Sequence, residues 1–442
     1  MNTNLIEGLS NLQPTDLDAG QLFSGKPSGT MVRGYAVASA YTPAIDHDYV
    51  FHESSRDVVV WFLNAQEPLY IFGPTGCGKT TCIKQLAARL NYPVFEVTGH
   101  GRLEFADLVG HLTVKNSTMT FEYGPLALAM RYGAIILLNE IDLTSPEIAA
   151  GLNSVLDGSP LCIAENGGEL IAPHPMFRLV ATANTNGGGD DTGLYQGTQR
   201  QNLAWLDRFC LCEVGYPAPD VEKALLERQF PVLPKEIRHK LVDYAGEVRK
   251  LFMGEADTGN LSGAIEVTLS TRTLLRWAEL TVRFQPLAHQ GIQPVTYALD
   301  RALGFRATRE TRAMLHELAQ RIFPQKEDGS ASFTISAKQS EQVWEQQLQA
   351  LSGIDLSKLT QPLPVIRLHK LGTNANGGKF WKAEIMLTGL RLTWGRFNTA
   401  GQSTVIEIDQ CVGNHPVQEC ISRMQSKLRN GYSIDTTNTQ IS

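Results

Sequence analysis

The sequence contains no long hydrophobic run and no paired cysteines. No apolar stretch is long enough to span a bilayer, and Met1–Glu7 has neither the basic region nor the apolar core of a secretion signal. The seven cysteines are scattered without a C-x-x-C pair, so buried free thiols are a better interpretation than a metal site. We therefore expect a soluble, cytoplasmic protein with no membrane contact.

An excess of positive charge is also missing from the chain as a whole. The 442 residues carry a net charge of −6, so the overall composition does not indicate a nucleic-acid-binding protein. The segment 363–442 is an exception, because nine lysines and arginines stand there against five acidic residues. Hydrophobic residues make up 43% of the chain, which at this length predicts more than one domain with a buried core.

A glycine-rich loop gives the strongest functional signal. Residues Gly73–Thr80 match the pattern G-x-x-x-x-G-K-T, follow an apolar strand-like stretch and precede a helical run. Such a loop directs backbone N–H groups at phosphate oxygens, while Lys79 reaches the β- and γ-phosphates and the Thr80 hydroxyl can ligate Mg²⁺. We predict that ATP and Mg²⁺ bind here. The predicted binding residues are Gly73, Pro74, Thr75, Gly76, Cys77, Gly78, Lys79, Thr80 and Thr81.

Two further strand ends carry polar residues. The apolar run 135–138 is followed by Asn139 and Glu140, and the strand 179–182 leads to Asn184. Because open α/β sheets bind ligands at the carboxyl ends of their strands, Glu140 is a candidate general base and Asn184 a candidate contact for the attacking water. Asn139 stands where an aspartate usually holds the hydration shell of Mg²⁺, so we expect it to contact the metal through water.

Two arginines are candidates for stabilising charge on the γ-phosphate. Arg208 closes a short helix and suits an arginine finger that acts across a subunit interface. The alternative is an ordinary surface arginine in a salt bridge. Arg272 follows a Ser-Thr helix cap and could reach over the nucleotide; a solvated helix-start arginine is an equally good interpretation.

The alternation of short apolar strands and helices predicts an α/β fold in which a parallel sheet has helices on both faces. We expect a loosely held arm over 1–40, a nucleotide-binding domain over 41–219, a helical lid over 220–324, a linker over 325–362 with a helix near 340–351, and a small α+β domain over 363–442. The expected strands of the sheet are Leu69–Phe72, Val94–Val97, Ile135–Asn139, Leu179–Thr182 and Cys210–Val214.

The ordered motifs resemble those of AAA+ ATPases of the MoxR and chelatase branch. They are the phosphate loop, Leu137–Asp142, Ala181–Asn184, Leu206–Phe209 and Ser270–Arg272. Within this branch the likeness is closest to CobS, the ATPase subunit of aerobic cobaltochelatases, and it covers about residues 41–285. The departure from the family is Asn139, where the family has aspartate, and this puts the strength of hydrolysis in doubt.

The resemblance implies several properties beyond the motifs themselves. It implies a ring, a hexamer, a partner with a von Willebrand factor A domain, and two β-hairpin insertions near 112–123 and 160–171. It also implies that Asn184 is a sensor, Arg208 an arginine finger and Arg272 a lid sensor.

The C-terminal segment resembles a WGR domain, a module best known from DNA-dependent poly(ADP-ribose) polymerases, where it binds DNA ends. The resemblance is carried by Lys379–Trp381, by Trp394-Gly395-Arg396 and by the Gly401-Gln402 pair before a helix. Basic residues and interleaved aromatics suit phosphate contacts and stacking. The candidate DNA contacts are Trp394, Arg396, Trp381, Lys379 and Lys382. Trp394 as core packing is an equally good interpretation.

Three functions are compatible with these features. The first, which we favour from the sequence, is an ATP-hydrolysing AAA+ ring that remodels or moves a macromolecule and is recruited to DNA by the WGR-like domain. The second is the ATPase motor of a cobalt or magnesium chelatase-like complex. The third is a nucleotide-gated scaffold with weak hydrolysis, which Asn139 would permit.

Overall fold

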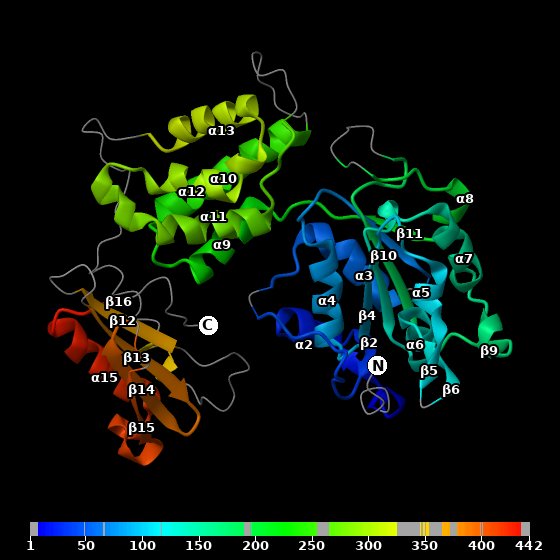
Figure 1. Cartoon of the computed structure of the whole chain (residues 1–442), viewed down its shortest axis with the longest axis horizontal. Coiled ribbons are helices and arrows are strands. Elements are labelled where there is room, and N and C mark those ends of the chain that lie inside the picture. The colour runs from blue at the N-terminus through cyan, green and yellow to red at the C-terminus, as the bar shows by residue number, and fades with distance from the viewer. Residues whose placement is uncertain are drawn as a thin grey trace. The chain divides into compact units, whose positions relative to one another are not determined.

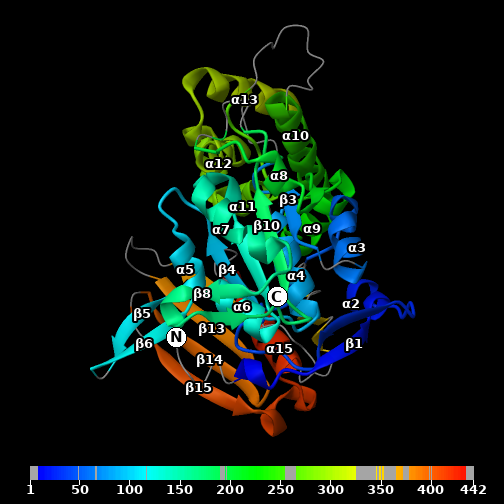
Figure 2. The same ribbon diagram turned by 90° about the vertical axis from the view of Figure 1, so that its right-hand side faces the viewer.

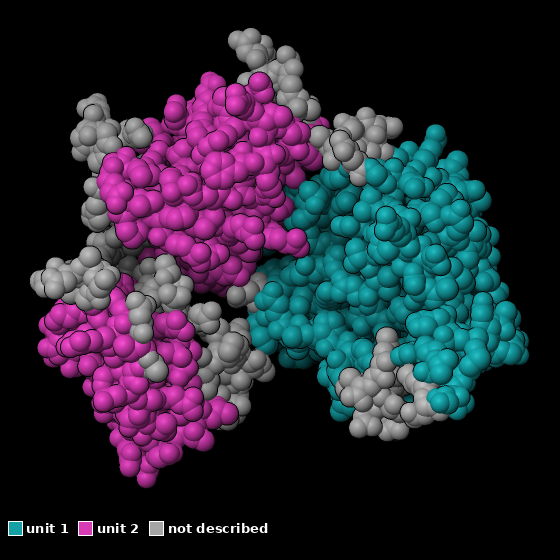
Figure 3. All heavy atoms as spheres, viewed as in Figure 1, with its two compact units in different colours: residues 1–222 teal, residues 223–442 magenta. Residues whose placement is uncertain are grey.

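In the computed structural model the chain forms two compact units, residues 1–222 and 223–442 (Figures 1 and 3). The residues that the structure describes are 8–47, 49–64, 67–115, 117–189, 195, 197–253, 265–324, 345, 348–349, 351–352, 365–371, 378–397, 399 and 401–434. Among these residues, no helix combines the length and the apolar character that a membrane crossing requires.

The first unit is built on a parallel sheet of five strands, in the order β11-β3-β10-β7-β4. These strands span Cys210–Glu213, Leu69–Phe72, Arg178–Ala183, Ile135–Asn139 and Val94–Thr98. All five lie where the sequence predicts them, to within one residue at each end. The three central strands β3, β10 and β7 are mainly apolar runs without polar alternation, because such strands of a parallel sheet are buried on both faces.

Helices cover both faces of this sheet, which confirms the predicted fold class. Successive strand residues point to opposite faces, so Tyr70 belongs to one buried cluster and Ile71 to the other. Helices α6 (Pro125–Tyr132) and α7 (Pro146–Leu156) contribute to the Tyr70 cluster. Helices α5 (Phe105–Val109) and α8 (Leu203–Leu206) belong to the Tyr70 cluster, and α3 (Arg56–Asn64) and α4 (Lys79–Arg89) belong to the Ile71 cluster.

Two β-hairpins interrupt the α/β pattern where the family resemblance predicts insertions. Strands β5 (Gly110–Lys115) and β6 (Thr118–Tyr123) form the first, and Figure 2 shows it extending to one side. Strands β8 (Leu161–Ile163) and β9 (Glu169–Ile171) form the second. The Tyr123 hydroxyl donates a hydrogen bond to Glu169 Oε2 at 2.8 Å, so the two hairpins are connected.

The N-terminal residues do not form the loosely held arm expected from the sequence. Strands β1 (Pro14–Asp18) and β2 (Met31–Tyr35) pair antiparallel around helix α2 (Ala19–Ser24). Val32 and Tyr35 are buried in the same cluster as the sheet. The Tyr35 hydroxyl also donates a hydrogen bond to the Gly133 carbonyl at 2.8 Å. The prediction was wrong because these contacts join segments about a hundred residues apart, which local patterning does not reveal.

The second unit begins with helices, as predicted. Helix α9 leads into it and the helices that follow are packed around the buried aromatic side chains of Tyr244, Trp277 and Phe323. No strand occurs over 219–322 in the part of this segment that the structure describes. The helices are α9 (Pro219–Gln229), α10 (Lys235–Met253), α11 (Thr271–Arg283), α12 (Pro294–Ala302) and α13 (Arg309–Ile322).

The chain ends in an antiparallel sheet of five strands in the order β15-β14-β13-β12-β16, with helix α15 (Pro416–Arg429) packed against it. The strands span Gln402–Glu407, Gly389–Arg396, Gly378–Met386, Val365–Leu371 and Ser433–Ile434. This confirms the antiparallel strands and the following helix expected from the sequence. Most of the predicted linker, 325–362, lies outside the described residues, including most of the helix expected near 340–351.

Candidate nucleotide-binding site

The phosphate loop joins the carboxyl end of β3 to the amino end of α4, as its sequence predicts. Gly73 is required because a Cβ atom there would lie 2.1 Å from the Val214 carbonyl oxygen. Gly78 caps α4 with a φ of 99°, a left-handed conformation that favours glycine. The loop therefore brings its backbone to the first turn of a helix, where N–H groups lack partners within the helix and can bind an anion.

Lys79 and Asn184 meet beneath this loop. The Lys79 ammonium donates hydrogen bonds to the Gly73 and Pro74 carbonyls at 2.7 and 3.0 Å and to Asn184 Oδ1 at 3.2 Å. Lys79 is buried, and this burial lowers the pKa of its ammonium. The hydrogen-bond acceptors of the ammonium are thus neutral oxygens, although the Asp142 and Glu140 carboxylates also act on its charge. An entering phosphate would supply an anionic hydrogen-bond partner.

Thr80 and Asn139 form the neighbouring part of the site. The Thr80 hydroxyl donates to Asn139 Oδ1 at 2.7 Å, and the Thr182 hydroxyl donates to the same oxygen at 3.0 Å. The Asn139 amide nitrogen donates to Glu96 Oε1 at 2.7 Å, and Glu96 is paired with Lys84 at 2.5 Å. Two neutral oxygens side by side fit a Mg²⁺ ion that retains most of its water ligands and is also bound by phosphates.

Glu140 follows directly on the strand end and is exposed. Its φ is 54°, in the left-handed region that non-glycine residues rarely adopt. Its backbone N–H lies 3.4 Å from the Thr182 hydroxyl. An unfavourable backbone conformation of this kind is typical of functional sites, and it makes the chain turn immediately after Asn139.

Asp142 supports the site, and the sequence reasoning assigned it no role. The side chain is fully buried, and Oδ2 accepts hydrogen bonds from the Asn184 N–H at 2.9 Å and the Thr185 N–H at 3.2 Å. It therefore fixes the backbone that presents Asn184 to Lys79. Its place in the Leu137–Asp142 motif was the available signal, but the burial of its carboxylate could not be read from that motif.

Two tyrosines also reach the phosphate loop and were missed. The Tyr216 hydroxyl donates to the Thr75 carbonyl at 3.0 Å, and the Thr75 N–H lies 3.4 Å from the Tyr195 hydroxyl. Both contacts join positions more than a hundred residues apart in sequence. No local motif marks them.

Arg208 lies at the amino-terminal end of the parallel strands, whereas the phosphate loop lies at their carboxyl-terminal end. It precedes β11, whose first residue Cys210 pairs with Leu69 at the start of β3, whereas the loop follows the end of β3. Its guanidinium is paired with Asp157 at 2.7 Å and donates to the Ala204 carbonyl at 2.6 Å. The length of strand β3 therefore separates Arg208 from Lys79.

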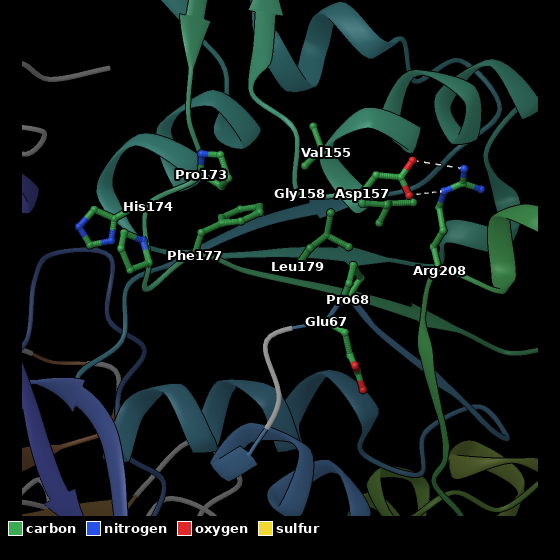
Figure 4. A pocket seen from close by; sticks show the side chains of 12 residues that line it. Glu67, Pro68, Val155, Asp157, Gly158, Pro173, His174, Phe177, Leu179 and Arg208 are labelled. Carbon is green, nitrogen blue, oxygen red and sulfur yellow. Dashed lines mark hydrogen bonds and ion pairs between the residues drawn. The ribbon is translucent and has the colours of Figure 1, made fainter.

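A cavity of about 510 Å³ lies beside Arg208, at the amino ends of β3 and β10. Figure 4 shows Arg208 and Asp157 at one end of this cavity and His174 at the other, with Leu179 and Phe177 between them. Burial lowers the pKa of His174. The cavity therefore lies at the opposite end of β3 from the phosphate loop.

Arg272 lies in the first turn of α11, in the second unit. The Ser270 side chain caps this helix by accepting a hydrogen bond from the Thr273 N–H at 3.2 Å. The expected serine cap is therefore confirmed. The side chain of Arg272 is exposed, and its role as a lid sensor stays a prediction.

The structure corrects part of the expected DNA-binding set. Trp381 is only 2% exposed and packs in the core of the C-terminal sheet, so it cannot stack on a base. Trp394 is paired opposite Trp381 and packs against the same core, half-buried. On the other face of the sheet, Lys382 is paired with Glu384 at 2.5 Å. The alternation of strand residues places both tryptophans beneath α15.

Lys379 and Arg396 remain available in this set. They are paired opposite one another on β13 and β14, and both are exposed. They lie near the end of the two strands, beyond the part of the face that carries Trp381 and Trp394.

Comparison with known proteins agrees with this geometry. Residues 68–201 match the family described as AAA domain (dynein-related subfamily), and residues 222–322 match the family described as CbbQ/NirQ/NorQ C-terminal. The chain is 30% identical to the aerobic cobaltochelatase subunit CobS of a Sinorhizobium species, over 61% of this chain and 82% of that protein.

Two other relatives match smaller shares of this chain. Protein NorQ of Paracoccus denitrificans is 30% identical over 58% of this chain and 85% of its own length. Protein CbbQ of Hydrogenophilus thermoluteolus is 28% identical over 42% of this chain and 66% of its own length. The first family match ends at residue 201 and the second at residue 322, before the C-terminal sheet.

Proposed function

Because this chain belongs to the family of AAA+ ATPases that includes CobS and NorQ, we propose that it is the ATP-driven motor of a complex that remodels a partner protein. This is the chelatase-like function rather than the DNA-recruited one that we favoured from the sequence. Its support is the similarity to a cobaltochelatase subunit and to NorQ over most of their lengths. The chain is an ATPase.

The observation that carries the proposal is the convergence of Lys79, Thr80, Asn139 and Asn184 at one edge of the sheet. We assign the β- and γ-phosphates to the loop and Lys79. Mg²⁺ would be held by Thr80 and, through water, by Asn139, and when bound it would neutralise charge on the phosphates. Glu140 follows as the base that orients and deprotonates the attacking water.

Completion of the site requires a neighbouring subunit. Arg208 lies at the edge opposite the chain's own loop, which is the arrangement that an intersubunit arginine finger needs. We therefore propose a ring, a hexamer by analogy with the family, that acts in the cytoplasm. The partner with a von Willebrand factor A domain follows from the same analogy.

Steady-state ATP hydrolysis tests this proposal. Lys79→Ala should abolish nucleotide binding, and Glu140→Gln should bind ATP while kcat falls about 100-fold or more, the scale of a lost general base. Lys26→Ala and Glu165→Gln are matched controls, since both side chains are exposed and outside the site. The nucleotide-gated scaffold would be supported instead if the wild-type protein bound ATP and assembled but hydrolysed little ATP, and if Glu140→Gln did not lower that rate.

DNA recruitment through the WGR-like region is a second proposal, carried by the exposed Lys379–Arg396 pair. If it holds, the double variant Lys379→Ala/Arg396→Ala lowers affinity for a DNA duplex end, and the loss shrinks as salt rises. Lys370→Ala is the control, because that ammonium is bound to the Asn430 carbonyl. Unchanged binding, or no binding by the wild type, removes this proposal and leaves the motor proposal standing.

A further inference from the structure

A second cavity lies beside Arg208, and the candidate site described above does not use it. Its volume is about 420 Å³, and helix α7 and the segment 199–208 line it. Arg200 and Arg208 both line it, as do Asn153 and Trp205. The expected site residues include Arg208 but not Arg200.

The backbone on both sides of Arg200 is held in place. The Gln199 N–H donates to the Asp142 carbonyl at 2.7 Å, and the Gln201 N–H donates to the Gly187 carbonyl at 2.8 Å. Arg200 between them is exposed, and its side chain makes no hydrogen bond or ion pair with any residue that the structure describes. The fold thus presents a free guanidinium on a fixed segment.

A carboxylate neutralises the guanidinium of Arg208 but not that of Arg200. Asp157 accepts hydrogen bonds from Arg208 at 2.7 and 3.3 Å, so a carboxylate already neutralises that guanidinium. Among the described residues that line the cavity, none neutralises Arg200. The positive charge of this cavity is therefore carried mainly by Arg200.

Two residues that line the cavity, Asn153 and Trp205, also carry buried polar atoms without partners. Trp205 is 3% exposed, and its indole N–H has no hydrogen-bond partner among the described residues; Asn153 Oδ1 is likewise unpaired. Buried polar groups in proteins are normally paired, often by a bound molecule or an ordered water. A free guanidinium that lines a cavity favours an anionic group rich in acceptor oxygens, such as a phosphate.

We propose that Arg200 is a second cation that each subunit contributes to its neighbour's nucleotide, beside Arg208. The inference rests on the proposed ring. Arg200 contacts the phosphates that face the subunit interface, and Arg208, held by Asp157, supplies the directional contact. The Asp142 carbonyl that holds Gln199 belongs to the residue whose carboxylate holds Asn184. The segment that carries Arg200 is therefore attached to the subunit's own nucleotide site.

Single variants give the first test, on the full-length chain with ATP and Mg²⁺. In Arg200→Ala we expect kcat to fall about tenfold, the scale of one lost charge-assisted hydrogen bond. The KM for ATP should change less than about twofold, because each subunit's own loop binds the nucleotide. Arg200→Lys should recover part of kcat. Arg33→Ala, an exposed arginine in β2 outside both cavities, should match the wild type.

Mixed rings give the decisive test. A Glu140→Gln subunit lacks the base but supplies intact arginines to its neighbour, so adding it to Arg200→Ala subunits should raise the activity per Arg200→Ala subunit. Adding Arg208→Ala subunits to Arg200→Ala subunits should not raise the activity, because each nucleotide then faces a neighbour that lacks one of the two arginines. A folding defect in Arg200→Ala would not be corrected by a second inactive variant.

The outcomes separate the two proposals. If Arg208→Ala is rescued by Glu140→Gln while Arg200→Ala hydrolyses ATP like the wild type, the ring stands and the role of Arg200 is wrong. If Arg200→Ala is impaired but not rescued, Arg200 does not act on a neighbour. If the wild type forms no ring, or Arg208→Ala is fully active, the proposed ring with its intersubunit arginine finger fails together with this inference.

Discussion

At the scale of single residues, Asn139 is matched to its surroundings. Its amide nitrogen donates to Glu96, a carboxylate that an aspartate at this position would repel, and its oxygen accepts from Thr80 and Thr182. The negative charge that the family carries on the strand end is thus one hydrogen bond away, on Glu96. An amide at this position keeps the oxygen that a hydrated Mg²⁺ needs.

This pairing predicts that Asn139→Asp is harmful alone and tolerated with Glu96→Gln. The single variant places two carboxylates at hydrogen-bond distance and removes a donor, which should lower the free energy of unfolding by about 1–3 kcal/mol. In Asn139→Asp/Glu96→Gln the glutamine amide can donate to the aspartate. The free energy of unfolding measured by urea denaturation should therefore return close to the wild-type value.

The control is Glu96→Gln alone, which keeps an acceptor for Asn139 and loses only the half-exposed ion pair with Lys84. Such a pair is worth about 0–1 kcal/mol. Equal stability of the single and double Asn139→Asp variants would show that Glu96 does not determine the choice of asparagine.

At the scale of elements, the N-terminal hairpin is part of the ATPase core. Asp18 organises it by accepting hydrogen bonds from the Gln21 N–H at 2.9 Å, the Ser28 N–H at 3.0 Å and the Gly29 N–H at 2.8 Å. These donors, the Gln21 N–H first, lower the pKa of its carboxyl from 3.8 to about 2. One side chain therefore caps α2 and closes the loop to β2.

Asp18 should make the stability of the first unit depend on pH. Its folded-state pKa is below its unfolded value, so the stabilisation is complete above pH 3.8 and is lost as the pH falls from 3.8 towards 2. Thermal unfolding of the wild type and Asp18→Asn from pH 7 to pH 2.5 measures this. The difference in Tm between them should be constant above about pH 5 and shrink below pH 4.

The comparison with an isosteric amide removes the contribution of every other carboxyl group. A difference in Tm that is zero at neutral pH, or that grows in acid, would contradict the assignment to Asp18.

At the scale of the whole molecule, the C-terminal sheet has its own buried core, and the described part of the preceding segment belongs to it. Leu348 is fully buried in that core and Leu351 packs against it. A deletion at residue 360, within the linker expected from the sequence, would therefore expose an apolar surface. A deletion at residue 324 would remove that surface together with the sheet.

We expect the chain that ends at residue 324 to be monodisperse and the chain that ends at residue 360 to aggregate and bind a hydrophobic dye. Leu348→Ser/Leu351→Ser in the longer chain is the matched control and should restore solubility, because exposed apolar surface causes the aggregation. Size-exclusion chromatography and dye fluorescence measure both effects. Equal behaviour of the two chains would show that Leu348 and Leu351 do not depend on the sheet.

Local signals in the sequence determined the phosphate loop, the strands of the parallel sheet, the helical segment and the C-terminal strands. These signals are short-range: glycines at a tight turn, apolar runs that end in polar residues, and a serine cap before Arg272. The burial of Trp381 could also have been predicted from the sequence, because strand alternation puts it on one face with Ala383 and Ile385. Burial and pairing across the sequence were not available from such signals.

Only the tertiary structure decided that Glu96 pairs with Asn139, that Asp142 holds Asn184, that Asp157 neutralises Arg208 and that the N-terminal hairpin is buried. Each of these contacts joins segments that are distant in the chain, and their partners are selected by strand order and by the packing of helices on the sheet. The physical reason is that a side chain's own type sets which bonds it can make, while the fold sets which partner it meets.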